Sequence, residues 1–381
     1  MYKRIVDLKT LLEKKSHFLF GPRQVGKTTL IENSFPNALI IDLLDVKRYI
    51  SYQRDPSLFS EQVAAFKGDL VVIDEIQKAP ELLDEVQRLM KYKKWSFLLT
   101  GSSARKLIRS GTNLLGGRAW RADLYPLVSA EIPDFDLMQY INNGGMPEFY
   151  DSSHAQEELE NYVEVYLRHE IQEEGLVRQL QPFVHFLDVM GLSNASEIDL
   201  KSIADDANLN PKTVSNYIDI LTDTLLGYRL PAFTLTKKRR ATTRAKFYFF
   251  DVGVARVLTK QPKVANNSVG FVNLFEQFII GEVRAANAYL RKKANLTFWR
   301  STTGFEVDLI INQDMAIEIK STSLVKDKHL KSIRKFSEEQ LVKRLIVVSQ
   351  DSDKRMTDDH IEIYPWKTFL DELWHGDILS S

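Results

Sequence analysis

The residues with the clearest chemical meaning are positions 21–28, which read Gly-Pro-Arg-Gln-Val-Gly-Lys-Thr. In the spacing G-x-x-x-x-G-K-[ST], the glycines let backbone amides approach phosphates, the lysine reaches the terminal phosphates and the hydroxyl binds magnesium. The apolar run 17–20 suits a strand, and residues 28–31 can open a helix whose positive end faces the anion. The sequence therefore predicts a site for ATP or GTP with Mg²⁺. The residues expected to contact the nucleotide are Gly21, Pro22, Arg23, Gln24, Val25, Gly26, Lys27, Thr28 and Thr29, and Thr28 is also expected to bind the metal.

A pair of carboxylates follows a second apolar run, because residues 70–75 read Leu-Val-Val-Ile-Asp-Glu. Asp74 is expected to hold the magnesium, largely through its water, and Glu75 to polarise the water that attacks the γ-phosphate. The next predicted strand ends in polar residues, one of which could contact the γ-phosphate. Ser102 is the first choice for that role and Thr100 the second.

The elements that must position these groups are short strands alternating with helices. Apolar runs at 38–41, 70–73 and 97–99 are separated by helical stretches, a pattern typical of parallel strands buried on both faces. Pro80 suits the first turn of one connecting helix, and apolar residues over 82–90 recur at helical spacing. We therefore expect an α/β fold with a parallel sheet in this part of the chain.

Residues 200–221 have the pattern of a helix-turn-helix. A first helix would turn Ile203 and Ala204 inward, residues 208–210 would form the turn, and the second helix would begin at Pro211. The second helix would expose several polar side chains. Helix-turn-helix units also serve as packing modules and as lids, so this alternative stays open. The predicted DNA contacts from this helix are Lys212, Thr213 and Asn216.

Basic residues gather just after this pattern, with no acidic residue among them before Asp251. The whole chain has 51 Lys and Arg against 51 Asp and Glu, so a nucleic-acid partner would have to be bound by a local excess of this kind. The position of the cluster suits the hairpin of a winged helix, where cations contact phosphates independently of base sequence. A solvated charge run is the alternative. The predicted phosphate contacts are Lys237, Lys238, Arg239, Arg240, Arg244 and Lys246.

The segment 304–321 is expected to form two strands joined by a tight turn. If residues 312–314 form the turn, Asp308 lies directly opposite Glu318. Opposed side chains are about 5 Å apart at Cβ, close enough for two carboxylates to share one hard cation. Side chains alternate along a strand, so Lys320 would lie on the same face as Glu318. An ion pair on an exposed strand is the alternative.

A third carboxylate joins this set from a helical stretch at 271–280, where the neighbours of Glu276 are mostly apolar. Burying it unpaired would cost on the order of several kcal/mol, which a metal partner could offset. We therefore predict a Mg²⁺ site, with Mn²⁺ as an alternative ion, at Glu276, Asp308 and Glu318. With Lys320 beside it, this is the chemistry of a metal-dependent phosphodiesterase.

Several motifs together resemble a prokaryotic AAA-type ATPase family in which a domain of unknown function usually follows the ATPase. The resemblance implies an AAA-type P-loop domain, which we place at residues 1–158. It also makes Arg118 a candidate for an arginine that stabilises transition-state charge in a neighbouring subunit, with a surface arginine as the alternative. Such ATPases commonly form rings, so the resemblance implies a homo-oligomer, for which a hexameric ring is one form. The motifs that carry it are 20–30, 72–80, 99–103, and 115–118 followed by 124–127.

The arrangement Asp308…Glu318-x-Lys320 resembles the PD-(D/E)xK nuclease superfamily, although Val307 stands where that label has proline. Glu276 resembles the helical acid of the same superfamily. The resemblance implies a restriction-endonuclease-like α/β domain, which we place at 245–381, after a helical and winged-helix domain at 159–244. This fold also occurs as a DNA-binding module, so cleavage stays open.

The composition and length of the chain exclude several kinds of site and indicate how many units it forms. The chain has no cysteine, which excludes disulfides, thiolate zinc sites and cysteine nucleophiles. No apolar run approaches the roughly 18 residues of a membrane helix, and the first seven residues do not begin a signal peptide. We therefore expect a cytoplasmic protein without a membrane span. A length of 381 residues suggests two or three units.

Together these observations favour an ATP-hydrolysing, DNA-processing protein with Glu75, Arg118 and Lys320 as its predicted catalytic residues. DNA is the predicted partner, and branched DNA such as a Holliday junction is one candidate substrate. The main alternative is a nucleotide-controlled switch that binds DNA or protein without cutting. A DNA-binding regulator without motor activity is the third.

Overall fold

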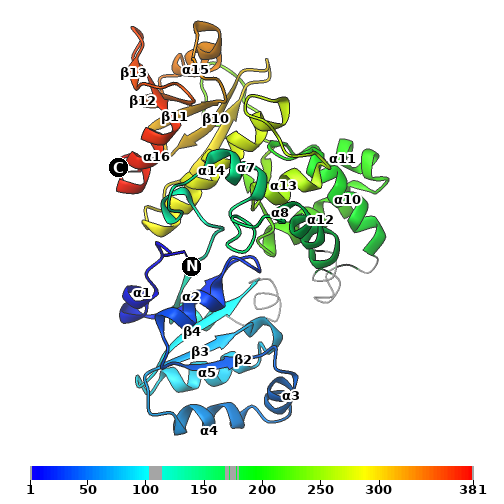
Figure 1. The fold of residues 1–381 in the computed structure, drawn as a ribbon, viewed down its shortest axis with the longest axis vertical. Coiled ribbons are helices and arrows are strands. Elements are labelled where there is room, and N and C mark those ends of the chain that lie inside the picture. Colours follow the sequence, from blue (N-terminus) through cyan, green and yellow to red (C-terminus); the bar gives the residue numbers. More distant parts are fainter. Residues whose placement is uncertain (1, 103–113, 168–170, 172–176, 178–179, 380–381) are drawn as a thin grey trace. The chain divides into compact units, whose positions relative to one another are not determined.

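The computed structural model describes residues 2–102, 114–167, 171, 177 and 180–379, and the chain separates into two compact units (Figure 1). The first unit runs to Leu127 and includes Asp223–Leu226, and the second contains 128–222 and the chain from Gly227 onward.

This division differs from the three domains expected from the sequence. The predicted boundary at 244/245 falls inside the second unit, because the segment before it runs alongside the later strands. Isolated bridges join Ala232 to Phe298 and Ala241 to Ser301, so the segment before the predicted boundary pairs with the strand region that follows it.

The first unit is built on a five-stranded parallel sheet with the order β2-β3-β4-β1-β5. Strands β1 and β3 are buried along their whole length, as their apolar runs predict. Helix α5 packs Leu82, Leu83, Val86 and Leu89 into the same core, which confirms the predicted helical face. The elements are α1 (Leu8–Lys14), β1 (Ser16–Phe20), α2 (Lys27–Ser34), β2 (Leu39–Asp42), α3 (Val46–Arg54), α4 (Ser57–Ala65), β3 (Leu70–Asp74), η1 (Ile76–Lys78), α5 (Leu82–Met90), β4 (Ser96–Gly101), η2 (Leu114–Gly117) and β5 (Ala119–Asp123).

The second unit begins with helices around a small antiparallel sheet of order β6-β8-β7. Helices α11 and α12 are joined by a short turn in which Asn208 takes the left-handed conformation, with φ of 52°. Ile203 and Ala204, expected to face inward, are buried, as are Val214, Ile218 and Leu221 of α12, so the two helices and the turn of the predicted helix-turn-helix are present. The elements are η3 (Ser129–Glu131), α7 (Leu137–Asn143), α8 (Ala155–Asn161), the π-helix η4 (Tyr162–Leu167), α10 (Leu180–Leu192), β6 (Ser196–Glu197), α11 (Leu200–Ala207), α12 (Pro211–Asp223), β7 (Gly227–Leu230), β8 (Lys246–Phe249) and α13 (Val252–Leu258).

The rest of this unit is a six-stranded mixed sheet of order β13-β14-β12-β11-β10-β9. Strand β10 pairs antiparallel with both β9 and β11, while β11, β12 and β14 run parallel. The long helix α14 packs against β11, and α15 packs against β10 (Figure 1). The elements are α14 (Val269–Tyr289), β9 (Leu296–Arg300), β10 (Glu306–Ile311), β11 (Met315–Lys320), η5 (Asp327–Leu330), α15 (Lys331–Ser337), β12 (Arg344–Ser349), β13 (Arg355–Met356), β14 (Ile361–Pro365) and α16 (Trp366–His375).

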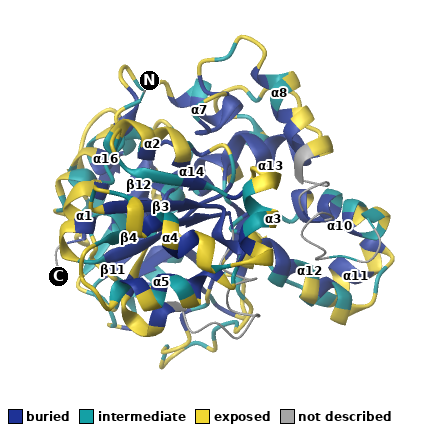
Figure 2. Cartoon of the chain, turned by 90° about the horizontal axis from the view of Figure 1, so that it is seen from below, coloured by how far each residue is buried: buried dark blue, intermediate teal, exposed yellow. Residues whose placement is uncertain are grey.

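Burial follows these layers (Figure 2). The strands of both large sheets are mostly buried, whereas helices such as α4 and α11 expose one face. At 21 residues, α14 is the longest described helix, and none of the described helices is both long and apolar enough to cross a membrane.

Candidate functional site

The phosphate-binding loop lies where the sequence predicts it, between β1 and α2. Gly26 caps α2 in the left-handed region with φ of 89°, a conformation that favours glycine. At Gly21 a Cβ atom would meet the carbonyl oxygen of Leu124 at 2.5 Å, so a side chain there would displace the backbone. Both glycines are therefore needed for the shape of the loop. Pro22, Arg23, Gln24 and Val25 form the turn between them, and Thr29 follows Thr28 in the first turn of α2.

Lys27 lies inside this loop and is 7% exposed. Its Nζ donates to the carbonyl oxygens of Gly21 at 2.7 Å and Pro22 at 2.9 Å. These bonds hold the ammonium group against the loop that is predicted to surround the phosphates. A single positive charge at this position fits a triphosphate ligand.

The predicted magnesium ligands come together at the carboxyl ends of the strands. The Thr28 hydroxyl donates to Asp74 Oδ2 at 3.0 Å, and the Thr100 hydroxyl donates to the other oxygen of the same carboxylate. Thr100 lies on β4, between the strands that carry the loop and the acid pair. A hydroxyl and a carboxylate oxygen are ligands that Mg²⁺ accepts, so these residues fit the ion that accompanies ATP.

Glu75 directly follows β3 and is 6% exposed. Its backbone is left-handed, with φ of 58° and ψ of 45°, and the buried amide of Gln77 donates to its carboxylate. The same amide donates to the Ser102 hydroxyl at 3.1 Å. Gln77 therefore joins the predicted water-activating acid to the first-choice phosphate contact.

Sequence analysis missed Gln77, and one signal for it was present. Residue 77 is a polar side chain two positions after Glu75, next to Gly101 in space. A Cβ atom at Gly101 would lie 2.4 Å from Gln77 Oε1, so this glycine leaves room for the amide. Glycine at the end of a buried strand is a sign of such close approach.

Arg4 was also missed. Its guanidinium donates to the carbonyl oxygen of Val25 at 2.8 Å and to that of Tyr125 at 2.6 Å. An arginine near the start of the chain thus ties the phosphate-binding loop to the segment after β5. Arg118, predicted to act on a neighbouring nucleotide, lies exposed just before the edge strand β5, and its role stays a prediction.

The predicted carboxylates of the last part of the chain also come together. Strands β10 and β11 pair Leu309 with Ile317 and Ile311 with Met315, which is the register implied by a turn at 312–314 and puts Asp308 opposite Glu318. Asp308 Oδ2 accepts a hydrogen bond of 2.7 Å from the backbone N–H of Ile319.

Lys320 forms an ion pair with Glu318, so these two side chains share a face as predicted. The second carboxylate oxygen of Glu318 is buried and has no hydrogen-bond partner in the part of the chain that the structure describes. Burial, reinforced by the charge of Asp308, raises the pKa of Glu318 well above its usual range. For Lys320 burial acts to lower the pKa, but the charges of Asp308 and Glu318 outweigh it and raise the pKa.

Glu276, on α14, completes the predicted set, but its partners were not foreseen. Lys246 Nζ lies 2.9 Å from Glu276 Oε1, and the Tyr248 hydroxyl donates to the same oxygen at 2.7 Å. Lys246 also forms an ion pair with Glu306 and lies 4.0 Å from Asp308 Oδ1. Burial raises the pKa of Glu276, while the charge of Lys246 opposes that rise.

Lys246 was expected to be an exposed phosphate contact, and this expectation is wrong. The residue is 2% exposed because β8 turns its side chain into the acidic cluster. Burial acts to lower its pKa, but the carboxylates, led by Glu276, outweigh burial and raise the pKa. The sequence showed the positive charge of Lys246 but not the direction of its side chain.

The acidic cluster has an excess of negative groups. Its four carboxylates, from Glu276, Glu306, Asp308 and Glu318, meet the ammonium groups of Lys246 and Lys320 and, at Glu306, the guanidinium of Arg300. The carboxylates outnumber the cations around them, and Glu318 has one oxygen without a partner among the described residues. Such oxygen ligands are chemically suited to a hard divalent cation. Their present arrangement is different, since no group of three or more such side chains within the described ranges is placed to hold a metal ion.

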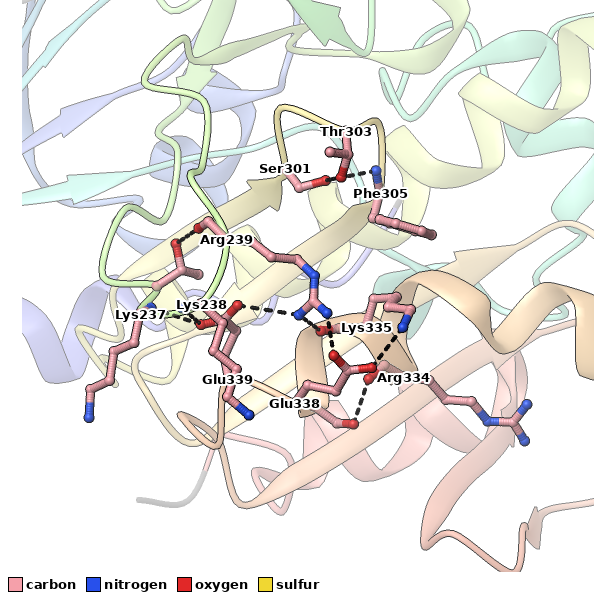
Figure 3. Close-up of polar contacts among 12 residues, drawn as sticks. Lys237, Lys238, Arg239, Ser301, Thr303, Phe305, Arg334, Lys335, Glu338 and Glu339 are labelled. Carbon is pink, nitrogen blue, oxygen red and sulfur yellow. Dashed lines mark hydrogen bonds and ion pairs between the residues drawn. The ribbon is translucent and has the colours of Figure 1, made fainter.

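The remaining basic residues form a segment between β7 and β8 that is anchored on α15 (Figure 3). Glu339, which is 3% exposed, accepts hydrogen bonds from the backbone N–H groups of Lys237 at 2.8 Å and Lys238 at 2.7 Å. Arg239 donates to the carbonyl oxygen of Lys335 at 2.8 Å and forms ion pairs with Glu338 and Glu339. Figure 3 shows Arg239 reaching toward α15 while Lys237 extends away from it.

The predicted cations thus divide into two kinds. Lys237, Lys238 and Arg240 have exposed side chains, whereas Arg239 is partly buried in the contact with α15. Arg244 is exposed but forms an ion pair of 2.7 Å with Asp199. In α12, Lys212 and Asn216 are exposed and Thr213 is half-buried.

Three family models match the chain. Residues 13–132 match one described as an AAA domain, residues 134–265 a domain of unknown function (DUF8612), and residues 271–369 a domain of unknown function (DUF4143). The resemblance to an AAA-type ATPase followed by a domain of unknown function is therefore confirmed. The first match contains the phosphate-binding loop and the acid pair and supports ATP binding and hydrolysis by this unit.

Relatives cover most of the chain at low identity. An uncharacterized protein of Mycobacterium bovis and one of Mycobacterium tuberculosis are each 23% identical over 327 residues, which is 80% of this chain and 70% of theirs. An uncharacterized protein of Methanocaldococcus jannaschii is 22% identical over 281 residues, or 65% of this chain and 63% of its own.

Two solved structures overlap only loosely with this chain. The replication initiator DnaA bound to AMPPCP and single-stranded DNA has a TM-score of 0.30 and 12% identity, over 56% of this chain and 85% of that one. The Aeropyrum pernix ORC1 protein in complex with DNA has a TM-score of 0.27 and 13% identity, over 65% of this chain and 87% of that one.

Proposed function

We propose that this chain, which joins an AAA domain to a region matched by DUF4143, hydrolyses ATP in its first unit and binds DNA with its second. One observation carries the first half of the proposal: the hydroxyls of Thr28 and Thr100 meet on Asp74, next to the Gln77 amide that holds Glu75. Thr28 and Asp74 would bind the magnesium, and Glu75 would orient the attacking water. Lys27 would contact the terminal phosphates.

The DNA-binding half rests on the helix-turn-helix and the basic segment after it. The order α10, β6, α11, α12, β7, β8, with a three-stranded antiparallel sheet, is compatible with the proposed winged helix, in which residues 231–245 would be the wing. The wing exposes Lys237, Lys238 and Arg240, and α12 exposes Lys212. Cations on such elements bind phosphates without reading the bases, so the proposed affinity is sensitive to salt.

The acidic cluster supports a further part of the proposal, a metal-dependent action on the phosphodiester. Glu276, Asp308 and Glu318 would hold Mg²⁺ or Mn²⁺, which when bound supplies a nucleophilic hydroxide near neutral pH. Lys320 would hold the phosphate beside them. The partnerless oxygen of Glu318 favours this reading.

The second candidate is a nuclease-like domain that binds DNA without cutting it. It is favoured by the ion pair of Lys246 with Glu276, one of the predicted metal ligands, and by the distance of 4.0 Å between Lys246 Nζ and Oδ1 of a second, Asp308. In this case ATP would control binding, and Arg118 of one copy would act on the nucleotide of another in a homo-oligomer. Branched DNA, including Holliday junctions, remains a substrate to be tested under either candidate.

The test of ATP hydrolysis and its coupling to DNA is phosphate release measured with and without duplex, single-stranded and branched DNA. We expect turnover that DNA stimulates, and a loss of about 10³-fold in Lys27→Ala, since the variant lacks the charge that contacts the phosphates. Lys91→Ala, on the exposed end of α5, is the matched control and should behave as wild type. Turnover that is absent, or unchanged by every DNA tested, would contradict the proposal.

Cleavage is tested separately with the same DNA molecules in Mg²⁺ or Mn²⁺. Wild type that cuts and Asp308→Ala that does not, with ATP turnover unchanged between them, would support the phosphodiesterase. Wild type that binds all of these DNAs but cuts none would favour the second candidate.

A further inference from the structure

Lys246 is the most deeply buried lysine of the acidic cluster. Its side chain is 3% exposed, whereas that of Lys320 is 32% exposed. It lies at the start of β8, whose pairing with β6 and β7 fixes the backbone, and its ammonium group can therefore move only by rotation of the side chain. Burying an ammonium group is unfavourable unless carboxylates surround it, and here they do.

The carboxylates around Lys246 include two of the three predicted metal ligands. The ammonium nitrogen is 2.9 Å from Glu276 Oε1 and 4.0 Å from Asp308 Oδ1, and it also contacts Glu306. A magnesium or manganese ion bound by Glu276 and Asp308 together would have to lie about 2.0–2.2 Å from their oxygens. The ammonium nitrogen pairs with Glu276 and lies within 4.0 Å of Asp308. A divalent cation bound to both carboxylates would therefore be close to a like charge, which is unfavourable at short range.

We propose that Lys246 is an internal competitor of the divalent cation, holding Glu276, Glu306 and Asp308 together until the cation replaces it. The proposal rests on the metal site described under the proposed function. It explains why the carboxylates lie close together while no three of them, among the described residues, are arranged around an ion. Binding of the cation then requires the Lys246 side chain to rotate out of the cluster.

Lys320 provides the contrast that makes the idea testable. It belongs to the same cluster and carries the same charge, but it forms its ion pair with Glu318 at the more exposed edge. Removing either lysine takes one positive charge from the site. Only removal of Lys246 takes away the ammonium group that pairs with Glu276 and lies 4.0 Å from Asp308.

The experiment is a calorimetric titration of the full chain with MnCl₂, in the absence of nucleotide and nucleic acid. The proteins are wild type, Lys246→Met, Lys320→Met, and Lys246→Met combined with Asp308→Ala, which identifies the binding event of this cluster. We expect Lys246→Met to bind Mn²⁺ at least tenfold more tightly than wild type, Lys320→Met to gain less than threefold, and the double variant to lose the event.

Equal affinities for wild type and Lys246→Met, or equal gains in the two lysine variants, would overturn the competition while leaving the metal site in place. Absence of any Asp308-dependent Mn²⁺ binding in all four proteins would remove both the competition and the proposed metal site. ATP turnover and DNA binding are measured independently, so their failure would not decide this question.

A second measurement covers the case in which Lys246→Met does not fold without the ion. Thermal melts of Lys246→Gln and wild type are compared with and without MnCl₂. Mn²⁺ should raise the Tm of the variant more than that of wild type, since only the variant has lost its internal cation. An equal rise in both proteins would overturn the proposal.

Discussion

The two groups of carboxylates in this molecule are stabilised in different ways. In the first unit, Asp74 and Glu75 are held by neutral donors, namely the hydroxyls of Thr28 and Thr100 and the amide of Gln77. In the second unit, Glu276 and Glu318 are held by the ammonium groups of Lys246 and Lys320. Neutral donors orient a carboxylate and leave its charge for a ligand cation, whereas ammonium groups balance the charge from within the chain.

Buried carboxylates can therefore be arranged either to bind an external cation or to pair with lysines of the same chain. Where the donors are neutral, the negative charge of the carboxylates is balanced only when an external cation binds, such as the magnesium that accompanies ATP. A site with its own lysines is closer to charge balance alone, and a cation must then compete with them. Four predictions test this difference, beginning with the largest expected effect.

The first prediction concerns the acid held by neutral donors. Glu75→Gln should lower ATP turnover about 10³-fold while ATP stays bound, because the amide cannot polarise the attacking water but leaves the phosphate contacts in place. Single-turnover hydrolysis and retention of labelled ATP on the protein measure the two effects. Glu81→Gln, an exposed acid before α5, is the control. Rapid release of ATP by Glu75→Gln would contradict the assigned role.

The second prediction concerns Glu282, a buried acid of the second unit whose hydrogen-bond donors among the described residues are neutral. Glu282 accepts from the backbone N–H of Ser129 at 2.7 Å, from its hydroxyl at 2.9 Å and from the indole of Trp374 at 2.7 Å. Burial outweighs these bonds and raises the pKa of Glu282 to about 7. Because the folded pKa is above the unfolded value, the stabilising contribution is complete below about pH 4.5 and is lost as the pH rises through about 7.

As the pH rises from about 4.5 to about 7, Glu282 is expected to lower the unfolding free energy of wild type by about 3 kcal/mol. Glu282→Gln has no carboxyl group to titrate and should not show this decrease. Urea titrations of both proteins from pH 4.5 to pH 8 measure the difference. Glu157→Gln, exposed on α8, controls for loss of a charge. Parallel pH profiles for wild type and Glu282→Gln would show that neutral donors are enough to keep this acid ionised.

The third prediction separates orientation from chemistry in the nucleotide site. Gln77→Leu keeps the approximate size of the side chain but removes the amide that joins Glu75 and Ser102. ATP turnover should fall about tenfold with little change in KM, because a misplaced base slows the chemical step more than binding. Gln87→Leu, a partly exposed position on α5, is the matched control. An unchanged kcat would mean that Gln77 is only a packing residue.

The fourth prediction, with the smallest expected effect, concerns Lys237 and Lys238, whose side chains are exposed. Replacing Lys237 and Lys238 by alanine should weaken DNA binding three- to tenfold and lower the salt dependence by about one to two counterions. Fluorescence anisotropy over a range of KCl concentrations measures both. Lys343→Ala, an exposed lysine paired with Asp314, is the control. A loss of affinity without any change in the salt slope would argue against phosphate contacts.

Sequence analysis found the groups that lie next to one another in the chain. The phosphate-binding loop, the acid pair after β3 and the pairing of β10 with β11 were all readable, since each depends on local spacing or on the period of two along a strand. The helix-turn-helix was readable for the same reason. Gln77 was not recognised, because its contact with Ser102 bridges 25 positions.

The extent of the compact units and the burial of Lys246 depend on contacts between residues that are far apart in the sequence. The sequence placed a basic hairpin after the helix-turn-helix but did not show that Glu339, about a hundred positions later, accepts hydrogen bonds from the backbone of Lys237 and Lys238. Lys246 was counted with the exposed cations since a run of basic residues does not reveal which side chain turns inward. The acids that receive it, Glu276 and Glu306, come from a distant helix and strand.

The amino-acid sequence by itself determined the chemical groups and their local geometry: a loop that surrounds phosphates, acids at a strand end, and two carboxylates opposed across a hairpin. These follow from backbone periodicity and short-range spacing. Only the tertiary structure decided which donors the acids receive: neutral hydroxyls and an amide at Asp74 and Glu75, and the ammonium groups of Lys246 and Lys320 at Glu276 and Glu318. The physical reason is that burial and charge balance are properties of side chains brought together from distant parts of the chain.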